Sequence, residues 1–447
     1  MSAPGESAPE EDLLELQVVD TGQTLTRWNA YEFGSNFRTA ADGFSLETGG
    51  KENPPAKEVE ALKPGARVQL RIRGLVQATG YIDDVEPDTS PSKGKILKVT
   101  GKDVMGPLVM GGADPFNLKF SPNQTLADFV EGVFAPYGFK TYTESDAANR
   151  AVRTGLRAEK FTKVKGKPIK SSIFTEQLKP HPGESIHQYA TRIINRAGYF
   201  FWPSADGTSV VVGLPDYEQA AIAKLTRRID DPTANNILSG GVKCRTSRQV
   251  GAIIATGFTG GGEWPRSHYK VGMMNELVTI ATGIELGAFE GSITTSPRSP
   301  GLTNVFRDSR FSDSRLNVRR DLDDIFLEND DCLVLSPRQF PDSVLRPLPY
   351  STVTFLHDDE AKTQDQLIRF VQREMSHIQC EMWVGDYVVH GHTYNGVPWT
   401  VNTIVDVDDD HSNFHAPMWV GGRSFIRQGR SPMTHLQLIL PHTMEFP

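Results

Sequence analysis

The sequence predicts an α+β fold that is mainly β, with two β domains separated by a segment of helices and hairpins. Three observations predict it: apolar and polar residues alternate in segments of both halves, amphipathic helical patterns lie between them, and turn residues recur at short intervals. At 447 residues the chain is longer than one hydrophobic core usually serves, which predicts about two to four domains.

The first β domain is expected at residues 14–107, after a disordered leader at 1–13 that is rich in Pro, Ser and Glu. The stretch "RVQLRIRGLV" places Val68, Leu70 and Ile72 on one face of a strand and basic or polar residues on the other. The strand-like segments "TGYIDDVEP" and "GKILKVTGKDV" follow, with turn residues between them. This spacing predicts a small sandwich or barrel.

A helix-and-hairpin domain is expected at 108–228. In "TLADFVEGVFAPYGF" the apolar residues recur at helical spacing, and Thr125 is a suitable N-cap. In "GESIHQYATRIINRAGYFF" a capping box of Ser185 and Gln188 begins a second helix, and a glycine ends it. Asp206–Gly207 then separates two strand-like segments, which is the pattern of a β-hairpin.

The second β domain is expected from two separate segments, 229–262 and 380–441, and is followed by a tail at 442–447. Residues 263–379 between these segments are predicted to be a charged insertion, because Gly, Pro, Ser and Arg are frequent and periodicity is lost. An irregular stretch of that length favours extended loops that a partner orders.

One helix is predicted inside the insertion, near residues 363–378. The stretch "TQDQLIRFVQREMSHIQ" has apolar residues at helical spacing, and Thr363 with Gln366 repeats the capping-box pattern.

Composition narrows the classes of function. A net charge of -8 disfavours a dedicated nucleic-acid binder, which needs surplus Lys and Arg. Cys244, Cys332 and Cys380 lie far apart without a CxxC motif, so neither a zinc cluster nor a disulfide framework is predicted. The sequence shows neither a signal-peptide pattern nor a window of about 18 apolar residues, so no membrane segment is predicted. The basic stretch 157–170 could bind an acidic partner. The simpler interpretation is a solvated loop.

Enzyme motifs are absent: the sequence has no GxxxxGK[ST], HExxH, GxSxG or suitably placed GxGxxG. Two pairs are the basis of an alternative enzyme or metal-site hypothesis, Glu184 near His187 and His390 with His392. Residues two apart share a face of a strand, so the second pair could ligate zinc. Polar strand residues facing solvent or a neighbouring chain are the simpler interpretation, with Asn395–Gly396 as a hairpin turn.

The aspartates of "DVDDD", which follow the histidine pair, fit no calcium loop of the EF-hand type. Such a loop needs a glycine at its sharp turn and a distant glutamate. We therefore assign no catalytic residue, cofactor or metal from the sequence.

Five segments form a recognisable series: "FSLE", "GYIDDVEP", "LADFVEGVFAPYGF", "GESIHQYATRIINRAGYFFWPSADGTSVVVG" and "QREMSHIQCEMWVGDYVVHGHTYNGVPWTVNTIVDVDDD". Their order and spacing together resemble one family, the central baseplate hub proteins of contractile phage tails of the Mu type. The family is related in architecture to the T-even hub and to the N-terminal hub region of the type VI spike protein VgrG. The resemblance spans about residues 14–441, and the charged stretch 263–360 departs from it.

This resemblance implies two similar small β-barrels per chain and a homotrimer whose six barrels form a ring. One face of the ring would seat the six-fold tail tube, and the opposite face would hold a trimeric spike. DNA would pass through the channel without specific binding, and wedge or other baseplate proteins would contact the insertion. The implied location is the virion baseplate, assembled in the host cytoplasm, with no membrane partner.

The resemblance also implies that Trp399, Asn402 and Asp406 are structural residues of the last barrel. Trp399 is expected to pack in the core, and Asn402 to satisfy backbone groups. Two alternatives remain open at this point. One is the hub of a type VI or extracellular injection apparatus, or of a headless bacteriocin tail. The other is a tail-tip cell-wall hydrolase or metal-dependent enzyme.

Overall fold

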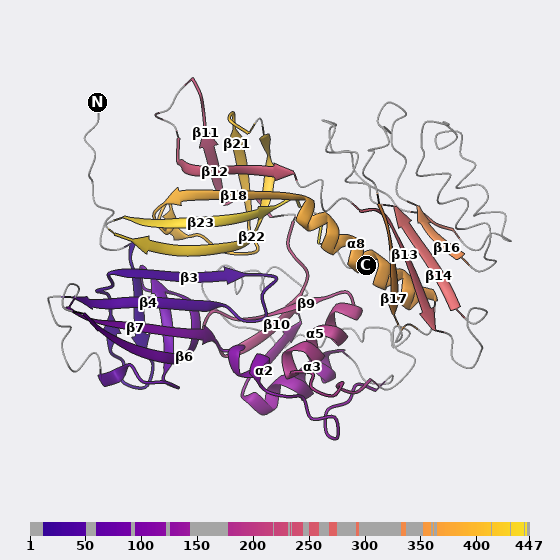
Figure 1. The fold of residues 1–447 in the computed structure, drawn as a ribbon, viewed down its shortest axis with the longest axis horizontal. Coiled ribbons are helices and arrows are strands. Elements are labelled where there is room, and N and C mark those ends of the chain that lie inside the picture. The colour runs from indigo at the N-terminus through magenta and orange to yellow at the C-terminus, as the bar shows by residue number, and fades with distance from the viewer. Residues whose placement is uncertain are drawn as a thin grey trace. The chain divides into compact units, whose positions relative to one another are not determined.

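The fold is that of a computed structural model of the chain (Figure 1). It describes residues 12–50, 60–90, 94–121, 126–143, 178–217, 219–230, 233, 235–244, 250–258, 268–274, 292–294, 332–336, 352–358, 361, 364–412, 414–429, 431–441 and 443–444. The chain divides into two compact units. The first comprises 1–171, 176–242 and 385–441, and the second comprises 172–175, 243–384 and 442–447.

The first unit is built on a 13-stranded sheet. Its strands are β1 (Leu14–Val18), β2 (Thr24–Leu25), β3 (Ala30–Asn36), β4 (Gly43–Gly50), β5 (Arg67–Ile72), β6 (Leu75–Ser90), β7 (Gly94–Asp103), β11 (Ala223–Arg227), β12 (Ile237–Cys244), β18 (Trp383–His390), β21 (Ile404–Asp409), β22 (Phe414–Gln428) and β23 (Pro432–Ile439). The order is β12-β18-β23-β22-β3-β4-β7-β6-β5-β1-β2, with β21 paired to β22 and β11 to β21. Pairs from β22 to β2 are antiparallel, whereas β11 and β21 are parallel.

The pairing of β22 with β3 joins the first and last parts of the sequence in one sheet, and the two strands lie side by side in Figure 1. It runs from Gly422 opposite Asn36 to Gln428 opposite Ala30. Phe425 lies directly opposite Phe33, and their ring centroids are 6.1 Å apart. Both side chains are buried, so the seam between the two halves is part of the core.

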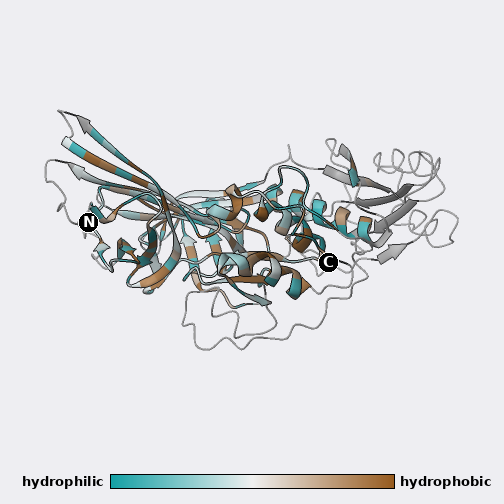
Figure 2. Cartoon of the chain, turned by 90° about the horizontal axis from the view of Figure 1, so that it is seen from below, coloured by the Kyte–Doolittle hydropathy of each residue, from teal (hydrophilic) through white to brown (hydrophobic). Residues whose placement is uncertain are grey.

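The predicted alternation in the first β domain is confirmed. Val68, Leu70 and Ile72 on β5 are all buried, and Figure 2 shows hydrophobic and hydrophilic residues interspersed along the strands. The strand ends one residue earlier than the pattern suggested, because Arg73 has a φ of 51° and Gly74 a φ of 74°. These left-handed conformations form the turn between β5 and β6.

Along the sequence, several helices and a small sheet lie between strands β7 and β11 of the first unit. The elements are α2 (Gly106–Met110), α3 (Leu126–Phe134), the 3-10 helix η2 (Ala135–Tyr137), β8 (Lys140–Thr143), α5 (Ile186–Arg196), β9 (Phe200–Pro203) and β10 (Ser209–Gly213). The capping box of Ser185 and Gln188 begins α5 as predicted, and the strands flanking Asp206–Gly207 pair antiparallel. Thr125 lies outside the described residues.

The two helices in this segment pack through aromatic side chains. Phe129 of α3 lies edge-on to Tyr189 of α5, with 5.5 Å between ring centroids, and Tyr189 is fully buried. The hydroxyl of Tyr189 donates to the carbonyl oxygen of Leu178 at 3.0 Å, which satisfies its polar end inside the core.

The second unit contains a five-stranded sheet and one long helix. Its elements are β13 (Val250–Phe258), β14 (His268–Met274), β15 (Ser292–Thr294), β16 (Cys332–Ser336), β17 (Thr352–Asp358) and α8 (Gln364–Met382), with the strand order β15-β16-β14-β13-β17. Leu367, Val371 and Met375 of α8 form a core cluster with Ile253 and Ala255 of β13. The predicted helix is confirmed, although it continues past residue 378 to Met382.

Three expectations about the domains are corrected by this arrangement. Strand β12 joins the C-terminal strands through β18, but β13 lies in the other unit. The described parts of the stretch predicted as irregular loops are strands β14 to β17. Asp12, expected in a disordered leader, is buried with 6% of its surface exposed. Alternation identifies a strand, but it does not identify the partner, which can be hundreds of residues away.

Several other expectations fall on residues outside the described part of the chain. They concern the basic stretch 157–170, Thr363 and most of the charged insertion. Among the described residues, no helix is both long enough and apolar enough to cross a membrane.

Truncating Phe425 tests the seam between β22 and β3. We expect Phe425→Ala to lower the free energy of unfolding of the first unit by about 3–5 kcal/mol, because it leaves a cavity beside Phe33. Urea unfolding followed by tryptophan fluorescence measures this change. Val397→Ala, at a side chain that is 39% exposed, is the control and should change the value by less than about 0.5 kcal/mol. Equal effects of the two changes would contradict the prediction.

Candidate functional site

The histidine-rich segment after β18 forms a short hairpin. Strands β19 (Thr393–Tyr394) and β20 (Val397–Pro398) pair antiparallel. Asn395 and Gly396 between them have φ angles of 50° and 81°, as a two-residue turn of type I′ requires. The predicted hairpin turn is therefore confirmed.

The two histidines do not share a face, so the hypothesis of a His390–His392 metal pair is wrong. Strand β18 ends at His390, which is exposed, whereas His392 is fully buried. Gly391 between them has a φ of 68°. A left-handed residue interrupts the extended conformation and so ends the two-residue alternation on which the expectation depended.

His392 is a hydrogen-bonded core residue between strands of both halves. Its Nε2 lies 2.7 Å from the hydroxyl of Tyr31 on β3, and its Nδ1 lies 3.1 Å from the hydroxyl of Thr434 on β23. The backbone N–H of His392 donates to Oδ2 of Asp12 at 2.8 Å. Burial lowers the pKa of His392 to about 4, so the ring is neutral at neutral pH. Both ring nitrogens are engaged, which leaves none for a metal.

The last aspartate of β21 forms a buried ion pair. Arg227 on β11 donates from Nε and Nη2 to the two carboxylate oxygens of Asp409, at 2.8 and 2.6 Å. The hydroxyl of Tyr387 also donates to Asp409, at 3.0 Å. Burial acts to raise the pKa of Asp409, but the hydrogen bonds from Arg227 and Tyr387 outweigh it and lower the pKa to about 2.

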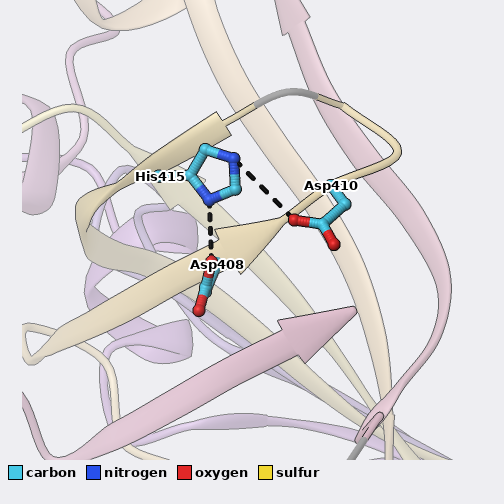
Figure 3. A group of neighbouring side chains, drawn as sticks. All are labelled: Asp408, Asp410 and His415. Atoms are coloured by element: carbon cyan, nitrogen blue, oxygen red, sulfur yellow. Dashed lines mark hydrogen bonds and ion pairs between the residues drawn. The ribbon is translucent and has the colours of Figure 1, made fainter. Parts of the chain in front are cut away.

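Asp408, Asp410 and His415 form a group with metal-ligand chemistry (Figure 3), and their ligand atoms lie within 4.8 Å of one another. Nδ1 of His415 is 2.7 Å from Asp408. However, Asp408 also binds Lys224 at 2.9 Å and Arg228, and the hydrogen bond from Lys224 leads the causes that lower its pKa to about 2. Two cationic side chains thus already balance this carboxylate. The group is an ion-pair network that holds β11 to the β21–β22 hairpin.

The second hypothetical pair, Glu184 with His187, is also not assembled. Nε and Nη2 of Arg192 donate to the carboxylate of Glu184 at 2.8 and 2.9 Å. Nδ1 of His187 lies 3.2 Å from the hydroxyl of Thr191, and its ring lies 4.9 Å from that of Phe201. Burial lowers the pKa of His187 to about 4. Each member of the pair therefore has its own structural partner.

The three residues expected to be structural lie in different environments. Trp399 is 2% exposed, and its ring centroid is 5.6 Å from that of Tyr394. Asn402 is 4% exposed, and its φ of 65° is left-handed. Its Oδ1 accepts hydrogen bonds from the backbone N–H of Asp216 at 3.1 Å and from Nε1 of Trp419 at 2.9 Å. Asp406 is an exposed residue of β21.

An aromatic cluster around Phe37 connects the end of β3 with β9 and with β22. The sequence analysis did not predict this cluster. Phe37 follows β3, and its ring lies 5.2 Å from Phe200 and 5.1 Å from Trp202, both on β9. It also lies 5.3 Å from Trp419 on β22. No periodic pattern marks Phe37, because it lies in a turn and its partners are far along the chain.

A polar cavity of about 120 Å³ opens beside this cluster. Its lining includes Gln77 from β6, Asp103 from β7, Asn402 from the segment before β21 and Arg423 from β22. Arg423 is 5% exposed and donates from Nη1 to Gln77 at 2.7 Å and to the carbonyl oxygen of Trp399. It thereby connects both halves of the sheet. Sequence reasoning missed Arg423 because an arginine on a strand is usually solvent-facing.

Two carboxyl groups, Asp42 and Asp103, also line the cavity. Burial raises the pKa of both groups, and for Asp103 the neighbouring Asp42 raises it further. Oδ1 of Asp42 accepts the backbone N–H of Asn36 at 3.0 Å, and Oδ1 of Asp103 accepts that of Met105 at 2.9 Å. These bonds hold the turns that follow β3 and β7.

The buried ion pair of Asp409 predicts a large cost for its loss. We expect Asp409→Asn to lower the free energy of unfolding by about 3 kcal/mol, because Arg227 would keep its charge without a partner. Asp406→Asn on the same strand is the matched control, since Asp406 is exposed. Chemical unfolding of both variants checks this, and a similar small effect in both would contradict it.

Burial of His392 predicts loss of stability in acid. Because the folded pKa is about 4 and the ordinary value is 6.5, the unfolded chain takes up the proton first as pH falls from 6.5 towards 4. The free energy of unfolding of the unaltered chain should fall between pH 7.5 and pH 4.5. We expect this fall to be smaller by about 2 kcal/mol in His392→Gln. His390→Gln, at the exposed neighbour, should leave that loss unchanged. Chemical unfolding curves of both variants at the two pH values measure the change. An equal fall in the free energy of unfolding in the two variants would contradict the prediction.

Comparison with known proteins relates the chain to phage baseplate and tail proteins. Residues 15–103 match the family model of the Mu phage baseplate assembly protein GpP-like N-terminal domain. Baseplate hub protein gp44 of Escherichia phage Mu is 29% identical over 136 residues, which are 30% of this chain and 35% of the phage protein. The chain thus matches about a third of the length of that relative.

Two solved structures share the fold over nearly the whole length. The tail protein from Neisseria meningitidis MC58 superposes with a TM-score of 0.65 at 18% identity and covers 97% of each chain. The 43 kDa tail protein of prophage MuSo2 from Shewanella oneidensis gives 0.61 at 15% identity, covering 97% of this chain and 100% of its own. The family model and these relatives are baseplate or tail proteins rather than enzymes. Residues 15–103 are thus similar to the GpP-like N-terminal domain of the Mu phage baseplate assembly protein, and nearly the whole chain shares its fold with the two tail proteins.

Proposed function

We propose that this protein is the baseplate hub of a contractile tail, where it joins the six-fold inner tail tube to the three-fold central spike. The observation that carries the proposal is the match to a baseplate hub protein, gp44 of phage Mu, together with the GpP-like domain at 15–103. The mainly β fold, shared with two tail proteins over 97% of the chain, supports it.

The proposed assembly is a homotrimer in which each chain contributes two small β-barrels to a ring of six. The sheet of the first unit supports this reading because it holds two groups of strands, β3 to β7 with β1 and β2, and β18 with β21 to β23. The two groups meet at the β22–β3 pair. A continuous hydrogen-bonded connection would hold two neighbouring barrels of the ring at a constant spacing.

The channel of the ring is proposed to pass DNA without holding it. The net charge of -8 supports this, because a negative wall repels a polyanion. Asp84, Glu86 and Asp88 on β6 are all exposed and alternate along the strand, so they give one face of β6 an acidic stripe. Wedge or other baseplate proteins are the proposed partners of the charged insertion.

Trp399, Asn402 and Asp406 are proposed to be structural residues, in keeping with the burial of the first two. The virion baseplate is the proposed location, with assembly in the host cytoplasm. The alternative proposal is the hub of a type VI or extracellular injection apparatus, because such a hub would have the same fold. The enzyme alternative loses its support, because neither Glu184–His187 nor His390–His392 forms a pair.

The solution mass tests the proposal. We expect light scattering to give a mass of three chains, for the protein alone or co-expressed with its candidate spike. Electron microscopy of that species should then show a ring with pseudo-six-fold symmetry. A strict monomer in both samples would contradict the tube-to-spike role.

A further inference from the structure

Strand β11 is an edge strand, because β21 is its one partner among the described strands (Figure 1). On the β21 side, the N–H of Asp410 donates to the carbonyl oxygen of Arg227 at 3.0 Å. The backbone groups of successive residues point to opposite sides of a strand, so those of Lys224, Thr226 and Arg228 point away from β21. Unpaired N–H and C=O groups on such an edge are a template on which another chain can add a strand.

Two consecutive asparagines, Asn235 and Asn236, occupy this free side of β11. Oδ1 of Asn236 accepts a hydrogen bond from the N–H of Thr226 at 2.8 Å, and its Nδ2 donates to the carbonyl oxygen of Lys224 at 2.7 Å. The backbone N–H of Asn236 donates to the carbonyl oxygen of Thr226 at 3.1 Å. Asn235 bonds both backbone groups of Arg228, the N–H at 2.6 Å and the carbonyl oxygen at 3.1 Å. Side-chain amides thus take the place of a neighbouring strand.

The same asparagines directly precede β12, which begins at Ile237 and pairs with β18. From β18 the pairings continue through β23, β22 and β21 to β11. The hydrogen bonds of Asn235 and Asn236 cross the remaining gap between the start of β12 and β11. Further along β12, the N–H of Val242 donates to Oγ of Ser412, in the turn between β21 and β22, at 3.4 Å. These contacts complete a ring of six strands.

Charged side chains do not protect the edge of β11 in place of the asparagines. A charged edge usually repels an added strand. Here Lys224 and Arg228 are both ion-paired with Asp408 of β21, Lys224 at 2.9 Å, so their charges are balanced within the chain. The asparagine side chains are therefore the groups that cover the backbone of this edge.

We propose that Asn235 and Asn236 form a latch, which closes the last group of strands into a barrel and keeps β11 from adding a strand of a second copy of the chain. A closed barrel has no free edge, and the latch reaches that state with side chains. Such protection matters where copies lie side by side, as in the proposed ring. This inference deepens the proposed function, but every contact of the latch lies within one chain.

Loss of the latch should open the gap between β11 and β12 without unfolding the sheet. Strand β12 stays attached through its pairing with β18, and β11 stays attached through its pairing with β21. The hydrogen bonds that disappear are local, so their loss should be visible at single backbone amides.

Amide hydrogen exchange of the full chain at residue resolution tests the latch. We expect Asn236→Ala to speed exchange at Thr226 by about tenfold, because water replaces Oδ1, while Arg228 keeps its protection. Asn235→Ala should do the reverse. The amide of Asp410, which bonds β11 on the other side, is the internal reference and should not change. Unchanged exchange at Thr226 in Asn236→Ala, or equal acceleration at all three amides, would overturn the latch.

Light scattering over a range of concentrations tests protection of the edge. The double variant Asn235→Ala/Asn236→Ala should form larger species than the unaltered chain at the same concentration. Asn117→Ala is the matched control, because Asn117 is an exposed asparagine whose Nδ2 bonds the nearby side chain of Asp114, and it should keep the unaltered mass. Equal masses of the double variant and the unaltered chain would overturn the protective role. A monomeric unaltered chain would contradict the hub instead, since the latch is judged by the difference between variants.

Discussion

The hydrogen-bonded pairing of β22 with β3 is the constraint on which the first unit depends. It places residues 30–36 beside residues 422–428 and makes one sheet from strands at the two ends of the sequence. Side chains of both halves then pack against one another at this seam. Phe33 meets Phe425 in the core, and Phe37 packs between β9 and β22. A shift of one residue in this register would turn the side chain of Phe425 to the other face of the sheet and break its contact with Phe33.

Buried polar groups give the seam its specificity. His392 hydrogen-bonds to Tyr31 and Thr434, and Arg423 reaches Gln77, so polar partners from both halves must meet in one register. The Asp409–Arg227 pair does the same for β11 and β21. Such groups are weak evidence for net stability, since desolvation offsets much of their attraction. Their effect is to penalise arrangements that leave any of them unpaired.

The proposed mechanical role suits this construction. An adaptor between tube and spike, as proposed, would have to keep the two groups of strands in the first unit at a constant relative position under load. A shared sheet with an aromatic cluster at its junction resists such displacement better than a flexible linker does, because hydrogen bonds and packed rings would have to break together.

The sequence by itself determined the local elements. The alternation of Val68, Leu70 and Ile72, the capping box of Ser185 and the turn at Asn395–Gly396 depend on neighbours within a few residues, so their pattern is visible in the letters. The resemblance to Mu-type baseplate proteins was also readable from the order of these segments. The metal hypothesis for His392 failed because a single left-handed glycine, Gly391, reverses the face of the next residue.

Only the tertiary structure decided which strands pair and which polar groups meet. Strand β13 has an apolar, strand-like sequence, yet it pairs with β14 and β17 instead of the C-terminal strands. Arg423 and Gln77 are 346 residues apart, and their contact exists only because β22 has joined β3. Contacts of this range depend on which of many alternative pairings buries the most surface and satisfies the most polar groups, and that choice belongs to the whole chain.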